Sequence, residues 1–148
     1  MKRKALQQLI EQARRGRDDA AVRVAGAHRE ADGAQRTLDT LAQYRHEHLR
    51  NAGARSSFDP AMLRLRDRFG QKLDGAIDEQ TRVRDTLHDT VDRRRDELVG
   101  RQRRLLAFET LQARRDAAST RLRERSEQRD TDERAAQLAR LRRIGNER

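Results

Sequence analysis

Residues 6–41 read LQQLIEQARRGRDDAAVRVAGAHREADGAQRTLDTL, and apolar side chains recur in this stretch at alternating intervals of three and four residues. Such a 3.5-residue period keeps one stripe of an α-helix facing a partner helix, so the stretch predicts a coiled-coil seam. The pattern lapses at Arg17 and fades at Arg45 and His48. Its apolar members are Leu6, Ile10, Ala13, Ala20, Val24, Ala27, Ala31, Ala34, Leu38 and Leu41.

The composition favours the same architecture. Of the 148 residues, 41% are charged, 34% are hydrophobic and 3% are aromatic, which is too few apolar residues to enclose a globular core. The chain is rich in good helix formers and keeps a sustained seam, so an ordered helix pair is favoured over disorder. Because the sequence contains no cysteine, a disulfide framework and thiolate chemistry are excluded.

The periodicity is interrupted once, at residues 51–60, which read NAGARSSFDP. Asp59 is a good N-cap and Pro60 suits the first position of a helix, so a second helix is expected to begin there. We therefore predict a first helix over about residues 3–49, a turn over 51–60 and a second helix over about 60–143. Gly145 is the expected C-terminal stop. Residues 1–148 are then interpreted as one coiled-coil domain.

The second helix carries a less regular seam. Its apolar residues predict two one-position shifts, known as stutters, which locally change a supercoil. The second helix is also much longer than the first, so residues beyond about 112 should form an overhang without a partner in this chain. The predicted fold is all-α, a long antiparallel two-helix coiled-coil hairpin with a C-terminal helical overhang. The predicted seam runs through Met62, Phe69, Leu73, Ala76, Val83 and Leu87, then Val91, Leu98 and Leu105, then Phe108, Leu111, Ala118 and Leu122.

Enzymatic function is not favoured by any motif. There is no G-x-x-x-x-G-K-[ST] phosphate loop, and a slender hairpin offers no concave pocket for acid–base chemistry. The best metal-ligand candidates, His46 and His48, are two positions apart and would point about 200° away from each other on a helix. We therefore expect no catalysis, no cofactor and no metal.

The formal net charge is +10, which is compatible with nucleic acid, an anionic membrane surface or acidic proteins as partners. Arginines alternate with acidic residues and there is no aromatic platform for stacking bases, so protein contacts and solvated faces are favoured over phosphate contacts. A basic coiled-coil adaptor that binds nucleic acid is kept as the alternative function. No apolar run is long enough for a signal peptide or a membrane span, so a cytoplasmic location is expected.

Three of the four aromatic residues, Tyr44, Phe58 and Phe69, lie close to the predicted turn. Aromatic residues there can widen the seam and clamp the turn, or they can form a recognition patch for a partner. The structural role is favoured for Phe58 and Phe69. For Tyr44, which lies beside the seam, both roles stay open.

Four stretches resemble the flagellar export protein FliJ family: residues 41–48 (LAQYRHEH), 69–80 (FGQKLDGAIDEQ), 104–112 (RLLAFETLQ) and 128–135 (QRDTDERA). Their order, the turn position and the chain length agree with that family together. The related stalk proteins of injectisomes share the architecture, and the Tyr44 and Asp132-Glu133 segments favour the flagellar family.

The resemblance implies a non-enzymatic stalk that links the hexameric export ATPase FliI to the export gate FlhA and to export chaperones. It further implies a protein peripheral to the cytoplasmic face of the inner membrane, held there through its partners. The gate-contacting residues would be Leu41, Tyr44, His48, Phe69, Leu73 and Ala76, and the ATPase-contacting residues would be Leu6, Ile10, Gln128, Asp132, Glu133 and Ala135.

Overall fold

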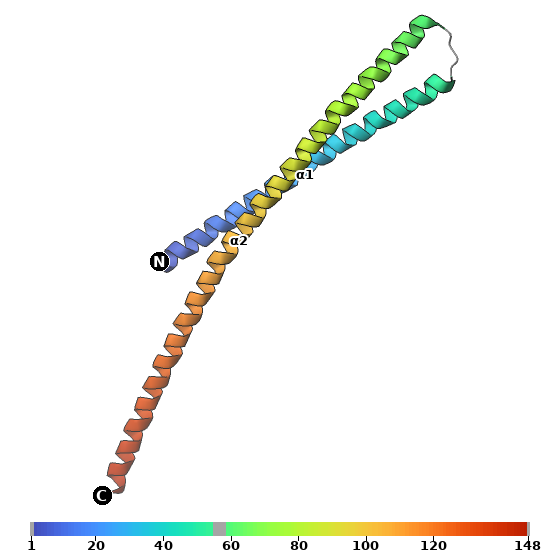
Figure 1. The fold of residues 1–148 in the computed structure, drawn as a ribbon. Coiled ribbons are helices and arrows are strands. Elements are labelled where there is room, and N and C mark those ends of the chain that lie inside the picture. Colours follow the sequence, from blue (N-terminus) through green and yellow to red (C-terminus); the bar gives the residue numbers. More distant parts are fainter. Residues whose placement is uncertain (1, 55–58, 148) are drawn as a thin grey trace. The chain divides into compact units, whose positions relative to one another are not determined.

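The computed structural model describes residues 2–54 and 59–147, which form two long helices and, over those residues, no strand. Helix α1 spans Arg3–Ala54 and helix α2 spans Pro60–Asn146 (Figure 1). The all-α two-helix hairpin predicted from the seam is confirmed. The chain divides into two units: a turn unit, Ala13–Arg103, and a terminal unit, Met1–Gln12 with Arg104–Arg148.

The helix ends differ in detail from their predicted positions. The expected N-cap is confirmed, since the Asp59 carboxylate accepts a hydrogen bond of 3.1 Å from the backbone N–H of Ala61. Helix α1 continues to Ala54 rather than ending near residue 49, so the first part of the predicted turn is helical. Helix α2 continues to Asn146, because Gly145 keeps a negative φ and does not stop the helix. Phe58 lies outside the described residues.

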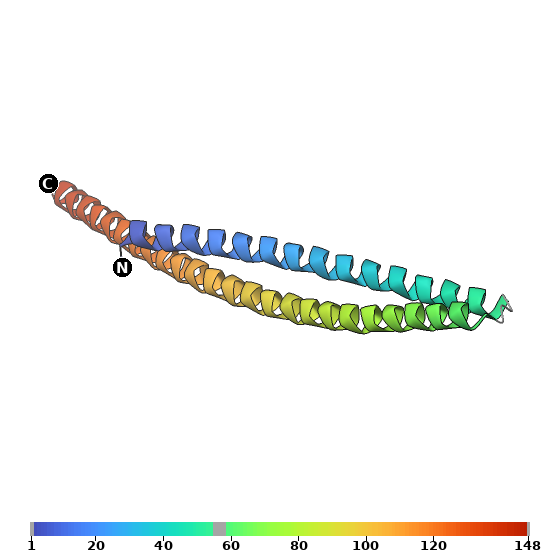
Figure 2. The same ribbon diagram turned by 90° about the horizontal axis from the view of Figure 1, so that it is seen from above.

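In the turn unit the two helices run antiparallel, side by side (Figure 2). Cross-helix contacts join successively earlier residues of α1 to later residues of α2. The Arg45 guanidinium lies 2.9 Å from the Asp74 carboxylate. The Gln80 amide donates to the Ala34 carbonyl at 3.4 Å, and Arg95 donates to His28 Nε2 at 3.0 Å.

The seam predicted in α1 is confirmed at every apolar position. Eight of the ten residues are buried, and Val24 and Leu41 are partly buried. In the turn unit a buried cluster joins Ala27 and Ala31 of α1 to Val91 of α2, with Leu87 packed against it. In the terminal unit the buried residues are Leu6, Ile10 and Leu105.

The two stutters predicted in α2 are wrong. From Arg66 to Leu98 most buried and partly buried positions of α2 keep a three-and-four spacing in one register, which resumes at Leu105. In contrast, seven of the predicted seam residues are exposed: Met62, Phe69, Ala76, Val83, Leu111, Ala118 and Leu122. The observed seam runs through Arg66, Gly70, Leu73, Ile77, Gln80, Arg84, Leu87, Val91, Arg94 and Leu98, and continues at Leu105, Phe108 and Gln112.

The small side chains of α1 explain this difference. Alanines occupy five of its ten apolar seam positions, so long polar side chains of α2 can lie across the pair with their methylene stems covered and their charged ends in solvent. Arg84 and Arg94 occupy seam positions in this way and pair with Asp85 and Glu97 at 3.0 and 3.2 Å. Phe69, Ala76 and Val83 are apolar and were predicted in the seam, but each lies one position before a true seam residue.

The predicted overhang is confirmed in the terminal unit. Gln112 is the last residue of α2 that is partly buried, and every residue from 113 to 147 is exposed. Helix α2 nevertheless continues through this segment to Asn146. Over the described residues, no helix is apolar over a length that could cross a membrane.

Candidate partner-binding surfaces

One flank of the turn unit carries exposed apolar side chains beside the seam. Phe69, Ala76 and Val83 each come one residue before a seam position of α2, and Tyr44 comes one residue before a seam position of α1. In an antiparallel helix pair these equivalent positions lie on the same side of the seam. Tyr44 is 53% exposed and Phe69 is 50% exposed. We call the set Tyr44, Met62, Phe69, Ala76 and Val83 the aromatic flank.

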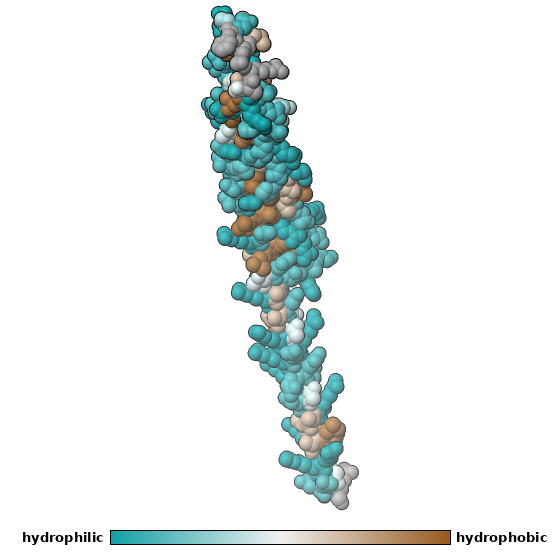
Figure 3. Space-filling model, turned by 90° about the vertical axis from the view of Figure 1, so that its right-hand side faces the viewer, coloured by the Kyte–Doolittle hydropathy of each residue, from teal (hydrophilic) through white to brown (hydrophobic). Residues whose placement is uncertain are grey.

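The opposite flank of the turn unit is mostly polar, with Leu49 as an exposed apolar residue. It holds the bond between Arg95 and His28 and the ion pair between Arg45 and Asp74. The two sides of the seam therefore differ in chemistry. A partner that binds through apolar contacts would bind on the aromatic flank. On the one face drawn in Figure 3, hydrophobic side chains likewise form an interrupted strip among hydrophilic ones.

His48 holds the two helices together beside Phe69. Its Nε2 lies 3.1 Å from the backbone carbonyl of Arg66 and, because a carbonyl only accepts, Nε2 carries the donated proton. The ring meets the Phe69 ring edge to face, with 5.0 Å between centroids and 71° between planes. A Cβ at Gly70 would lie only 3.4 Å from His48 Nε2, so glycine permits this close approach.

The six predicted gate residues therefore separate into two groups. Tyr44, Phe69 and Ala76 are exposed on the aromatic flank, while Leu73 is buried and Leu41 and His48 are partly buried in the pair. Leu73, Leu41 and His48 therefore contribute to the packing between the two helices, next to the exposed flank. Met62 and Val83, 45% and 39% exposed, extend it and were predicted as seam residues instead. Met62 and Val83 come one residue before Leu63 and Arg84, and they can be recognised as flank residues only when the register of α2 is known.

The six predicted ATPase residues all lie in the terminal unit. Leu6 and Ile10 are 3% and 4% exposed, so their side chains serve the packing of that unit. The other four are exposed on the unpaired part of α2, where Gln128 donates a hydrogen bond of 3.1 Å to Asp132. They are Gln128, Asp132, Glu133 and Ala135.

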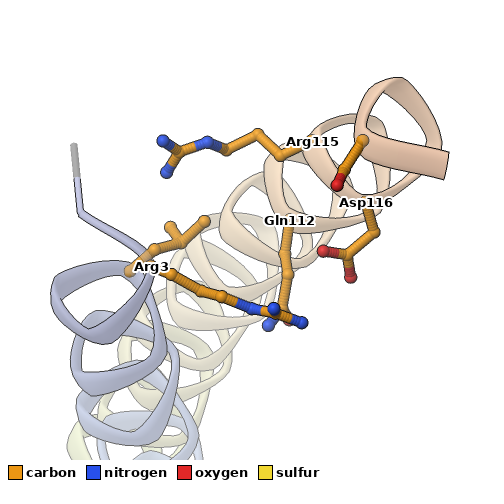
Figure 4. Close-up of a pocket in the computed structure, with 6 residues that line it drawn as sticks. Arg3, Gln112, Arg115 and Asp116 are labelled. Atoms are coloured by element: carbon orange, nitrogen blue, oxygen red, sulfur yellow. The ribbon is translucent and has the colours of Figure 1, made fainter. Parts of the chain in front are cut away.

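A pocket of about 190 Å³ lies in the terminal unit, where α1 begins beside α2. Leu6 is its buried apolar member, and Gln112 is partly buried. Arg3 extends from α1 toward Gln112, and Arg115 extends from α2 in the opposite direction (Figure 4). The complete lining is Arg3, Leu6, Gln112, Arg115, Asp116 and Ser119. Among the residues that the structure describes, no cluster of His, Cys, Asp and Glu could hold a metal ion.

Comparison with known proteins supports the family suggested by the motifs. The family model described as "Flagellar FliJ protein" matches residues 1–143 of the chain. No curated protein matches it.

Proposed function

The chain belongs to the flagellar FliJ protein family, whose members are non-catalytic components of the flagellar export apparatus. We propose that it acts as a stalk that couples the export ATPase ring to the export gate. In this proposal the terminal unit engages the hexameric ATPase FliI. The aromatic flank of the turn unit engages the gate protein FlhA, and export chaperones dock on the same unit. Association with the inner membrane then comes through these partners.

The observation that carries the proposal is the asymmetry of the turn unit. A helix pair needs apolar side chains only in its seam, yet Tyr44 and Phe69 are half-exposed beside it, on the same side. Rigid aromatic side chains on a rim of polar residues are typical anchors for a protein partner. Among the described residues, the other flank, with its Arg95–His28 and Arg45–Asp74 contacts, exposes Leu49 but no phenylalanine or tyrosine.

The test measures binding of the cytoplasmic part of the gate protein to Tyr44→Ala and Phe69→Ala, with helicity followed by circular dichroism. Each substitution should weaken gate binding about tenfold or more, because an anchor side chain contributes about 2 kcal/mol of binding free energy. Phe69→Ala should also lower stability, since it removes the contact with the His48 ring.

Leu49→Ala is the matched control, because Leu49 is an apolar residue of the same unit that is 61% exposed and comes one residue after the seam position His48, on the opposite flank. It should leave gate binding unchanged. Equal affinity of the wild type, Tyr44→Ala and Phe69→Ala for the gate would refute the proposed role of the flank.

A further inference from the structure

Positive charge is concentrated in the terminal unit near the start of α1. Residues 2–10 contain three cationic residues and no acidic one, and residues 112–123 of α2 contain four arginines and a single carboxylate, Asp116. The next segment, residues 124–133, has five acidic residues and only two arginines. Residues 134–143 carry four more arginines and no acidic residue, so the charge near the start of α1 is one of two basic stretches in this part of the chain. The seven cationic residues are Lys2, Arg3, Lys4, Arg114, Arg115, Arg121 and Arg123.

The 190 Å³ pocket lies among these residues, and two of them, Arg3 and Arg115, line it. Their side chains come from different helices and reach past each other, so the pocket has a guanidinium on each side (Figure 4). Gln112 and Ser119 add an amide and a hydroxyl that can donate hydrogen bonds. Leu6 supplies the apolar surface between them.

This lining matches one acidic side chain. A guanidinium presents paired donors that fit the two oxygens of a carboxylate, and the methylene groups of Asp or Glu can pack on Leu6. The pocket is smaller than the roughly 300 to 1,000 Å³ of small-molecule sites, which disfavours a nucleotide. Asp116 in the lining would repel the closely spaced phosphates of a nucleic acid more than a single carboxylate.

We propose that the pocket is a docking site for an acidic side chain of a protein partner, held between Arg3 and Arg115. The inference rests on the proposed function in that it identifies this partner as the export ATPase. It assigns the contact on α1 mainly to Arg3, because Leu6 is the 3% exposed apolar lining of the pocket and Ile10 is buried and does not line it.

The experiment measures the affinity of the full-length chain for the purified ATPase. The Arg3→Glu/Arg115→Glu double variant should bind at least tenfold more weakly, because each substitution replaces an attraction to the bound carboxylate by a repulsion. Arg23→Glu/Arg68→Glu makes the same change in net charge at two exposed arginines, one on each helix, and should bind within about twofold of the wild type. Ser119→Phe fills the pocket without changing the charge and should also bind at least fivefold more weakly. Circular dichroism confirms that each variant keeps its helicity.

The outcomes separate the inference from the proposed function. A wild-type chain that does not bind the ATPase overturns both. Equal loss of binding in the two double variants would show general electrostatic attraction and would refute the pocket as the docking site. Full affinity of Ser119→Phe for the ATPase would also refute it. Duplex DNA is titrated in parallel over increasing salt. Salt-resistant DNA binding that is lost only in Arg3→Glu/Arg115→Glu would assign the site to nucleic acid instead.

Discussion

Val91 provides a quantitative test of the helix pairing, because the chain carries a matched valine in the opposite environment. Val91 is 3% exposed and packs on Ala27 and Ala31, whereas Val22 is 67% exposed on α1. Replacing a helical valine by alanine gains roughly 0.5 kcal/mol of helix propensity at either position. At Val91 the substitution also removes two buried methyl groups, a loss of about 1.6 kcal/mol, to which the cavity left behind adds.

We therefore expect the two substitutions to change stability in opposite directions. Val91→Ala should lower the free energy of unfolding by about 1 to 2 kcal/mol, and Val22→Ala should raise it by up to about 0.5 kcal/mol. The measurement is urea denaturation followed by circular dichroism, with the midpoints compared at an unchanged slope. A Val91→Ala midpoint equal to or above that of the wild type would refute the register that places Val91 against Ala27 and Ala31.

Two further predictions concern the helices themselves. Gly75→Ala and Gly100→Ala should each raise the free energy of unfolding by roughly 0.5 to 1 kcal/mol, because both glycines are helical and a Cβ would meet nothing within 4 Å. Thermal melting measures the change. A lowered melting temperature would contradict the open surroundings of these two positions. In the free protein, amide hydrogens of residues 113–146 should exchange much faster than those of residues 84–98, because no residue of the former segment is even partly buried. Mass spectrometry of exchanged peptides measures the difference, and equal protection along α2 would show that pairing does not govern helix stability.

The start of α2 and the seam of α1 were predictable because the physical signals are local. Alternating apolar residues from Leu6 to Leu41 define one helix face whatever the partner, and an Asp-Pro pair caps a helix through its own first turn. The overhang followed from unequal helix lengths. The end of α1 was not predictable to the residue, because the helix continues through Asn51 and Gly53, residue types that favour a helix stop.

The seam of α2 and the surfaces were decided by tertiary structure. Arg84 and Arg94 are partly buried at seam positions although both are charged, so their burial depends on packing against the other helix and not on their own hydrophobicity. That register in turn places Phe69 and Val83 on the exposed flank rather than in the core.

Apolar periodicity and the break at residues 51–60 predicted the fold, and the motifs indicated the family and the regions where partners are expected to bind. Which side chains are free to meet those partners depends on distances between residues far apart in the chain. Arg3 and Arg115 are 112 positions apart in the sequence, yet they line one pocket because antiparallel pairing brings the start of α1 to that level of α2. Helical periodicity fixes which residues share a face of one helix, and only the packing of two helices fixes which faces meet.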